Sequence, residues 1–285
     1  MPSDLPLSLP AILIDPHLQS WLQEDIGRGD WSTAGLGDLA RRPGEAIWVA
    51  KAPGIIAGLP VAARVFALLD PESGFDPQVA EGAFCEPGTV VAKLRGSLAT
   101  LLMGERVALN LAMRLSGIAT ATRQYVDALA DYPTQFVDTR KTTPGWRLLE
   151  KEAVKAGGGV NHRMGLYDAV LIKNNHISAA GSVTKALKGA LGQHPIVEIE
   201  VRTWDELNEA LDAGATRLLL DNLTPAEARR WIEHIAGRAS CEISGGVTLA
   251  TIRAYAEAGA DFVSVGALTH SATAVDLNFR LTLLP

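Results

Sequence analysis

Short apolar runs, each followed by a polar or glycine-rich turn, recur through the second half of this 285-residue chain. Nearly continuous apolar runs are typical of parallel strands that are buried on both faces, and helical patterns separate several of them. Alternating strands and helices predict either an α/β barrel or an open parallel sheet. The runs are TQFVDT (134–139), AVLIK (169–173), IVEIEV (196–201), RLLLD (217–221), CEISG (241–245) and FVSVG (262–266).

Polar residues stand at the end of run after run, and this decides between the two architectures. In a barrel the carboxyl ends of the strands converge on one mouth, whereas in an open sheet they spread along an edge. We therefore predict an α/β barrel, TIM-like but incomplete or irregular.

The first part of the chain has a different texture. Residues 46–95 hold β-branched runs punctuated by Gly and Pro, with the helix-like VAARVFALL (61–69) between them, which indicates an α+β domain with a partly antiparallel sheet. We divide the chain into an N-terminal domain, 1–112, and a barrel domain, 113–275. The C-terminal tail, 276–285, is a candidate to rejoin the first domain.

Helix boundaries are readable at several places. Asp15-Pro16 resembles an N-cap followed by proline at the first helical position, with Gly27 closing that helix. Thr203 with Glu206, and Thr224 with Glu227, are capping-box patterns. Val107, Leu111, Leu115 and Ile118 form one stripe of a helix expected over about 101–129.

Composition excludes several classes of function. The net charge of −6 opposes a nucleic-acid-binding surface, and no apolar stretch approaches membrane-spanning length. Cys85 and Cys241 are far apart, which suggests reduced thiols rather than a disulfide framework or a zinc site. The N-terminus lacks the basic and apolar segments of a signal peptide, so we expect a cytoplasmic protein.

Carboxylates occupy the predicted strands in an unusual way. In VEIEV (197–201), Glu198 and Glu200 share the face opposite to the valines and Ile199, which on a buried strand is the barrel interior near its mouth. Buried carboxylates are costly unless they meet cations, a metal or a developing positive charge, although an exposed edge strand would also tolerate them. Asp221 ends RLLLD, and because Thr224 is the better cap for the next helix, Asp221 is left for function.

Cationic side chains gather in the stretch 138–176 of this acidic chain, close to glycine-rich turns. Such a cluster predicts a pocket for a polyanionic small molecule, because Arg forms bidentate forks with carboxylate or phosphate and Lys acts as a movable charge. The alternative is a structural network with Glu198, Glu200 and Asp221. The cations are Arg140, Lys141, His162, Arg163 and Lys173.

Glycine-rich turns follow the last two predicted strands. Barrel enzymes most often bind phosphate there, through backbone N–H groups and a helix N-terminus. The candidate phosphate-binding residues are Ser244, Gly245, Gly246, Gly266 and Ala267.

The chain contains, in this order, DTRKTTPG, GGGVNHRMGLYD, LIKNNH, EIEV, LLLDN, SGG and SVGALTHSA, and upstream of them EDIGRGDWST, GIIAGL and ERVALNLAMRLSGIAT. Together these motifs resemble the quinolinate phosphoribosyltransferase family, also called carboxylating nicotinate-nucleotide pyrophosphorylases. The resemblance covers nearly the whole chain and implies an N-terminal α+β sandwich domain joined to a barrel, assembled as a homodimer or as an assembly of dimers.

The resemblance also implies a reaction. A glycosyltransferase of this kind moves the phosphoribosyl group of phosphoribosyl pyrophosphate (PRPP) to the ring nitrogen of quinolinate, with Mg²⁺, and gives nicotinate mononucleotide, pyrophosphate and CO₂ for NAD synthesis. Lys141, Glu200 and Asp221 would then be the catalytic residues: Lys141 would contact PRPP, and both carboxylates would serve its ribose and, indirectly, the metal. The glycine-rich turns would take its 5′-phosphate. The quinolinate carboxylates would fall to Arg140, His162, Arg163, Lys173 and, from the neighbouring subunit, Arg106.

One position departs from the pattern: Asn174 stands where we expect Asp in many relatives, which removes a negative charge beside Lys173. Other functions stay open. A ModD-like paralogue linked to molybdenum uptake shares the fold, a Schiff-base lyase would use Lys141 or Lys173 as nucleophile, and a sensor would bind phosphate ligands without turnover.

Overall fold

A computed structural model describes residues 9–284, which form two compact units. The first unit ends at Ala121 and also takes in Lys155–Gly158 and the residues from Ala272 onward, while the second comprises Thr122–Val154 and Gly159–Ser271. The long helix α4 (Leu98–Ala128) belongs to both units, and the predicted boundary after residue 112 falls within it.

The first unit contains a four-stranded antiparallel sheet of order β12-β1-β5-β3. Its last strand in the sequence, β12, runs along β1 from the pair Ala50–Leu277 to the pair Gly44–Leu283, so the C-terminal tail lies in the N-terminal sheet. A two-stranded sheet pairs β2 with β4. The strands are β1 (Pro43–Ala50), β2 (Gly54–Ile55), β3 (Gly74–Pro77), β4 (Phe84–Cys85), β5 (Val90–Ser97) and β12 (Leu277–Leu283).

Aromatic side chains join helix and sheet in this unit. Phe66 of α3 (Leu59–Leu69) stacks on Phe75 with ring centroids 6.2 Å apart, and Phe75 meets Trp48 edge-on at 5.4 Å. Such pairs add about 0.5–1.5 kcal/mol to the burial of their area. The short helices α2 (Trp31–Ala34) and η1 (Gly37–Arg41) precede the sheet.

The first helix begins earlier than its sequence pattern predicts. Helix α1 spans Ala11–Ile26, so Asp15 is not its N-cap and Pro16 lies inside it, although Gly27 does cap its C-terminus. Instead of capping, the Asp15 carboxylate accepts two hydrogen bonds from Arg64, at 2.6 and 2.8 Å. This ion pair and the burial of Ile14, which lies one turn before the buried Leu18, favour the longer helix.

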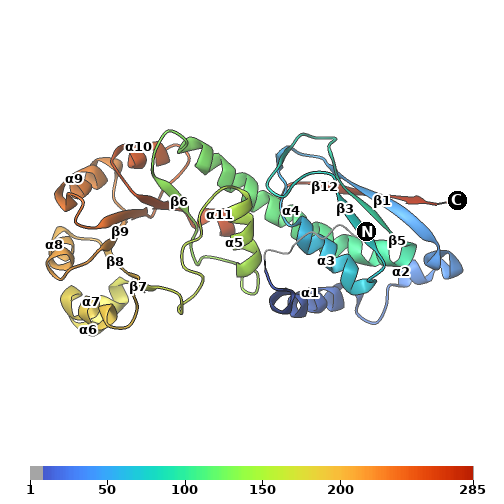
Figure 1. Ribbon diagram of the computed structural model, residues 1–285, viewed down its shortest axis with the longest axis horizontal. Helices are drawn as coiled ribbons and strands as arrows, with labels where there is room; N and C mark the ends of the chain where they lie inside the picture. The colour runs from blue at the N-terminus through green and yellow to red at the C-terminus, as the bar shows by residue number, and fades with distance from the viewer. Residues whose placement is uncertain (1–8, 285) are drawn as a thin grey trace. The chain divides into compact units, whose positions relative to one another are not determined.

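The second unit is built on a six-stranded, fully parallel sheet of order β6-β11-β10-β9-β8-β7. All of the predicted strands are confirmed, and Figure 1 shows helices α7 to α10 outside them, as in a TIM-like barrel. A single parallel bridge from Val137 to Val160 extends the β6 edge, and no strand within residues 9–284 closes the sheet between β6 and β7. The barrel is therefore irregular, as predicted. The strands are β6 (Gln135–Val137), β7 (Val170–Ile172), β8 (Val197–Val201), β9 (Arg217–Asp221), β10 (Ser240–Ser244) and β11 (Phe262–Ser264).

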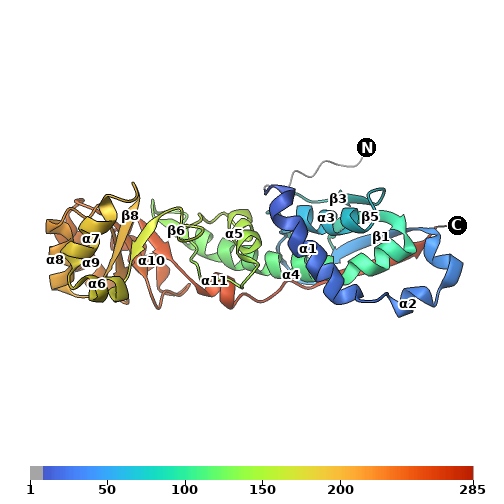
Figure 2. The ribbon, with the colours of Figure 1, turned by 90° about the horizontal axis from the view of Figure 1, so that it is seen from below.

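Helices follow the strands, and their caps agree with the sequence. Thr224 and Glu227 form a complete capping box at the start of α9, while Thr203 caps α8 by accepting from the Glu206 N–H at 3.2 Å. The helices are α5 (Arg147–Ala156), α6 (Asn174–Ala180), α7 (Val183–Leu191), α8 (Trp204–Asp212), α9 (Pro225–Ile235), α10 (Ile252–Glu257) and α11 (Ala267–His270). Figure 2 shows α1, α3 and α4 with the first unit and α6 to α9 with the second.

The predicted stripe of α4 is buried throughout: Val107, Leu111, Leu115 and Ile118 are core residues. Both cysteines are buried free thiols. Among the described helices, none combines the length and apolar character needed to cross a bilayer.

Candidate active site

A cavity of about 640 Å³ lies at the carboxyl ends of the barrel strands. It brings together side chains that follow β6, β7, β8, β9 and β10, which the sequence predicted to converge. Its lining includes Arg140, Lys141, His162, Arg163, Lys173, Glu200, Asp221, Ser244, Gly245 and Gly246.

The two glutamates of β8 point into the barrel, as their alternation predicted. Both are about 7 % exposed, and Ile199 between them is fully buried. Glu200 lines the mouth, where the Nζ of Lys173 lies 3.1 Å from its Oε2. This ion pair is one part of the structural network of cations and carboxylates that was the alternative to a ligand pocket.

Asp221, at the end of β9, faces a second carboxylate. Burial and the negative charge of Glu200 raise the pKa of Asp221 above its usual value, while Lys173 and a hydrogen bond from Asn222 oppose the rise. That hydrogen bond runs from Asn222 Nδ2 to Asp221 Oδ2 at 2.8 Å. Two repelling carboxylates in one cavity are suited to a hard divalent cation, because Mg²⁺ prefers oxygen ligands.

His162 is held from both sides of its ring. Its Nε2 lies 3.0 Å from Glu198 and 3.3 Å from Glu242, while its Nδ1 accepts a hydrogen bond from the backbone N–H of Arg163 at 2.7 Å. Burial disfavours the imidazolium, but the hydrogen bonds and charges of both glutamates outweigh it and raise the pKa of His162 to about 9. The backbone N–H of Arg163 opposes this rise in the pKa, because it donates to a lone pair that Nδ1 has only when Nδ1 carries no hydrogen. The ring hydrogen is therefore directed to Nε2.

His162, Glu198 and Glu242 have the separations of a metal site, since their ligand atoms all lie within 4.8 Å of one another. A metal at Nε2 would require the ring hydrogen on Nδ1, where metal-binding histidines commonly donate to a second partner. In this chain Nδ1 accepts instead. The arrangement therefore fits a hydrogen-bonded cluster better than a metal centre.

Two arginines in the mouth are arranged to receive an anion. The Nε of Arg140 is buried and has no hydrogen-bond partner within the described part of the chain. Burial, and then the positive charge of Arg140, lower the pKa of Arg163, and both arginines line the same cavity. Buried N–H donors that lack a partner are rare, so this pair is suited to an oxygen-rich ligand.

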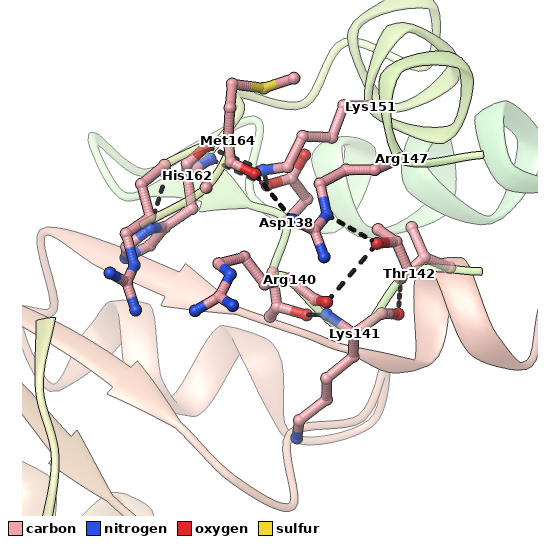
Figure 3. A network of polar contacts seen from close by, with 12 residues as sticks. Asp138, Arg140, Lys141, Thr142, Arg147, Lys151, His162 and Met164 are labelled. Carbon is pink, nitrogen blue, oxygen red and sulfur yellow. Dashed lines mark hydrogen bonds and ion pairs between the residues drawn. The ribbon is translucent and has the colours of Figure 1, made fainter. Parts of the chain in front are cut away.

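Lys141 turns away from Arg140, as Figure 3 shows, toward the loop after β11. A Cβ on Gly266 would lie 2.6 Å from the Lys141 side chain, and Thr269 donates to the Lys141 carbonyl at 2.7 Å. Lys141 and the Gly266–Ala267 turn are thus brought together, although that turn is not part of the cavity lining.

The loop after β10 has no room for a side chain at Gly245. Its φ is +88°, and a Cβ there would collide with the side-chain carbonyl of Asn222. Gly246 also has a positive φ, +64°. Two glycines in this conformation turn the backbone N–H groups of the loop in directions that other residues reach only with strain.

A buried ion pair contacts the backbone of His162, and Figure 3 shows both of its members beside that residue. Lys151 of α5 and Asp138 at the end of β6 are both inaccessible to solvent, with Nζ and Oδ1 2.5 Å apart. The same Oδ1 accepts from the His162 N–H at 2.9 Å, and Lys151 donates to the His162 carbonyl at 2.8 Å. In the amide orientation that satisfies its neighbours, Asn161 donates to Asp138 Oδ2 at 2.7 Å. Both peptide groups of His162 are thereby fixed.

Sequence reasoning missed Lys151 and Glu242. Lys151 lies in RLLEKEAVKA, where charges at helical spacing look like a solvated face, and no local signal separates it from its neighbours. Glu242 lies between Cys241 and Ile243 on β10, and the alternation that revealed Glu198 and Glu200 would also have revealed it.

Arg106 lies on α4 in the first unit and is not among the residues that line the cavity. Its side chain is 57 % exposed and its Nη2 lies 3.6 Å from Glu105.

Family models match most of the chain. The family models for the N-terminal and C-terminal domains of quinolinate phosphoribosyl transferase match residues 30–116 and 118–280. The chain belongs to the quinolinate phosphoribosyltransferase family. It is 52 % identical over 278 residues to a probable nicotinate-nucleotide pyrophosphorylase [carboxylating] of Synechocystis sp., covering 95 % of this chain and 94 % of that protein. A protein of the same name from Bacillus subtilis is 43 % identical over 93 % of this chain and 92 % of its own length.

Solved structures of the family agree with the fold. The crystal structure of NadC from Streptococcus pyogenes superposes with a TM-score of 0.92 at 41 % identity, covering 98 % of this chain and 100 % of that chain. The nicotinate-nucleotide pyrophosphorylase from Francisella tularensis gives 0.91 at 35 % identity, covering 96 % and 98 %. The expectation of a two-domain family member with an irregular barrel is confirmed.

Proposed function

We propose that this protein transfers the phosphoribosyl group of PRPP to quinolinate and decarboxylates the product to nicotinate mononucleotide, as a step of NAD synthesis. The observation that carries the proposal is one cavity in which several cations face two carboxylates. Family membership supports the same reaction, because relatives bear the names quinolinate phosphoribosyltransferase and nicotinate-nucleotide pyrophosphorylase.

Quinolinate binding is assigned to the cationic wall. Quinolinate carries two adjacent carboxylates, and a dianion needs more donors than a monoacid does. The buried, unpartnered Nε of Arg140 and the neighbouring guanidinium of Arg163 supply two forks. Lys173 supplies a mobile charge, and His162 lines the same wall with its Nε2 turned to Glu198 and Glu242.

PRPP is assigned to the opposite part of the mouth. Its 5′-phosphate would lie on the backbone of the Ser244–Gly246 turn and the Gly266–Ala267 turn, with Lys141 beside the latter. Glu200 and Asp221 would hold the ribose and, through it, the magnesium ion that accompanies pyrophosphate. When bound, Mg²⁺ would neutralise charge on the departing pyrophosphate.

Glycosidic bond formation then depends on charge stabilisation. Loss of pyrophosphate leaves positive charge on the ribose ring, and Glu200, which is nearly buried, is placed to stabilise it. Lys173 leaves Glu200 partly neutralised until the substrate carboxylates compete for the ammonium group. After transfer the ring nitrogen is cationic, and its charge stabilises the electron pair that departing CO₂ leaves on the adjacent ring carbon. That carbon then takes up a proton from water.

The proposal includes a homodimer in which Arg106 acts in the partner's site. Arg106 is exposed on its own unit and lies outside the cavity lining, which suits a residue that serves another subunit.

Turnover with quinolinate, PRPP and Mg²⁺ tests the proposal, followed by ring absorbance and released CO₂, with nicotinate as the control substrate. Turnover of quinolinate but not of nicotinate supports the proposal. Folded protein that binds PRPP but turns over neither acid would overturn it and favour the sensor or the ModD-like paralogue. Borohydride trapping of a lysine adduct with a carbonyl substrate would favour the lyase.

A further inference from the structure

One face of α5 contacts two of the loops that carry the proposed quinolinate-binding cations: the loop of Arg140, and the loop of His162 and Arg163. Arg147, Glu150 and Lys151 are spaced three and four residues apart, so they share that face. None of them lines the cavity itself. Their contacts go to the loop after β6 and to the loop that holds His162 and Arg163.

The first of these loops is fixed beside Arg140. Arg147 Nε donates to Thr142 Oγ1 at 2.9 Å, and Thr143 donates to Glu150 from both its N–H, at 3.0 Å, and its hydroxyl, at 2.8 Å. Asp138, bound to Lys151, anchors the same loop on the other side of Arg140. Arg140 is therefore held from both directions along the chain.

The second loop is fixed on both sides of Arg163 by the same helix. Lys151 donates to the carbonyl of His162, and Arg147 Nη1 donates to the carbonyl of Met164 at 3.2 Å. Figure 3 shows Arg147 between Thr142 and Met164, so that one guanidinium joins the two loops.

We propose that this face of α5 sets the distance between Arg140 and Arg163, and thereby selects an acid with two adjacent carboxylates over a monoacid. The inference deepens the proposed function and rests on it. A monoacid needs one fork, whereas a vicinal diacid needs two at a fixed separation. A misplacement of about 1 Å costs up to about a hundredfold when two groups must engage together.

Arg147, Glu150 and Lys151 are positioning residues, and a purely structural role must be separated from this one. The Asp138–Lys151 pair provides the means, because replacing both members of a buried ion pair with hydrophobic residues of similar volume is often neutral or stabilising for the fold. Asp138→Leu combined with Lys151→Met should therefore fold while releasing the His162 peptide. Arg147→Met, at a partly exposed position, removes one contact to each loop with less risk to folding.

The experiment measures quinolinate affinity by calorimetry, and kcat and KM for quinolinate, PRPP and nicotinate, in four proteins: wild type, Arg147→Met, the double variant, and the exposed control Arg229→Met on α9. We expect the quinolinate Kd and KM to rise about 10- to 100-fold in the two α5 variants. The KM for PRPP should stay within about twofold, and the control should match wild type. Arg147→Lys, which can reach only one acceptor, should be intermediate.

The preference for quinolinate over nicotinate in kcat/KM should fall together with the affinity for quinolinate in the two α5 variants. Unchanged quinolinate affinity in both α5 variants, or equal losses for both acids and PRPP, would overturn the inference and leave α5 a structural helix. If wild type itself neither binds nor turns over quinolinate, the proposed function has failed instead.

Discussion

The Nζ of Lys173, which follows β7, lies 3.1 Å from Oε2 of Glu200 on β8. Lys173 is half exposed and Glu200 is nearly buried, so the mobile cation covers the fixed anion. A carboxylate substrate that attracts the ammonium group would free Glu200 for the ribose. Under the proposed function, this ion pair would link binding of the acid to stabilisation of the transition state.

Glu200→Ala should lower kcat by about a hundredfold while changing the KM for quinolinate by less than about fivefold, because the carboxylate acts on charge that develops in the transition state. Steady-state kinetics for both substrates measure this, with the exposed Glu233→Ala on α9 as the control. Weaker binding of both substrates with an unchanged kcat would contradict that role.

Arg163→Ala should weaken quinolinate binding about 10- to 100-fold, because it removes a charged hydrogen-bonding partner. PRPP binding should be unaffected, since Lys141 and the glycine turns are assigned to it. Calorimetry with each ligand separately distinguishes the two, and Arg163→Lys should recover only part of the loss. An equal loss for PRPP would show that Arg163 shapes the whole mouth.

The charge state of His162 predicts a pH dependence of stability. Its pKa is raised from 6.5 to about 9 in the folded protein, so its stabilising contribution is complete below pH 6.5 and is lost as the pH rises through 9. Denaturant unfolding should show a decrease of about 1–3 kcal/mol from pH 6.5 to pH 9.5 that is missing in His162→Gln. If the free energy of unfolding changed with pH in the same way in both proteins, the backbone N–H of Arg163 would be keeping Nδ1 of His162 unprotonated.

Gly245→Ala should raise the KM for PRPP about tenfold or more, because the left-handed backbone conformation and the Asn222 carbonyl both exclude a Cβ, and relief of that strain, about 1–3 kcal/mol, displaces the turn. Gly189→Ala on α7 is the matched control, since no atom lies within 4 Å of the added Cβ. That control should stabilise the protein by about 0.5–1 kcal/mol with unchanged kinetics. Equal KM values in the two variants would remove the turn from PRPP binding.

A mixing experiment tests the placement of Arg106 across a dimer interface. Arg106→Ala and Lys173→Ala proteins should each be inactive. After free subunit exchange of equal amounts, about half of the dimers are mixed, and each mixed dimer holds one intact site of its two. Exchange should therefore restore up to about a quarter of the sites. Activity is measured before and after exchange. Absence of complementation, with exchange verified by mass, would place each site within one chain.

Sequence patterns predicted the barrel strands because buried parallel strands need apolar side chains on both faces, which leaves a signal in a single run such as RLLLD. The mouth residues followed from the same pattern, since each polar break marks a strand end. The alternation in VEIEV placed Glu198 and Glu200 inside the barrel for the same reason.

Other features depend on partners that are distant along the chain. Lys151 is buried only because Asp138 and the His162 carbonyl meet it, and α1 continues through Pro16 while Arg64 binds Asp15. The loops of Arg140 and Arg163 are likewise joined by contacts of Arg147 that no local pattern reports.

The pairing of β12 with β1 has a consequence for synthesis of the protein. Because β12 is encoded last, β1 keeps one open edge until Leu277–Leu283 have left the ribosome, by which time every barrel strand has emerged. The N-terminal sheet, although translated first, is thus completed last. An unpaired β1 is a template for other chains, so a product truncated before Leu277 would be prone to aggregation rather than merely shorter.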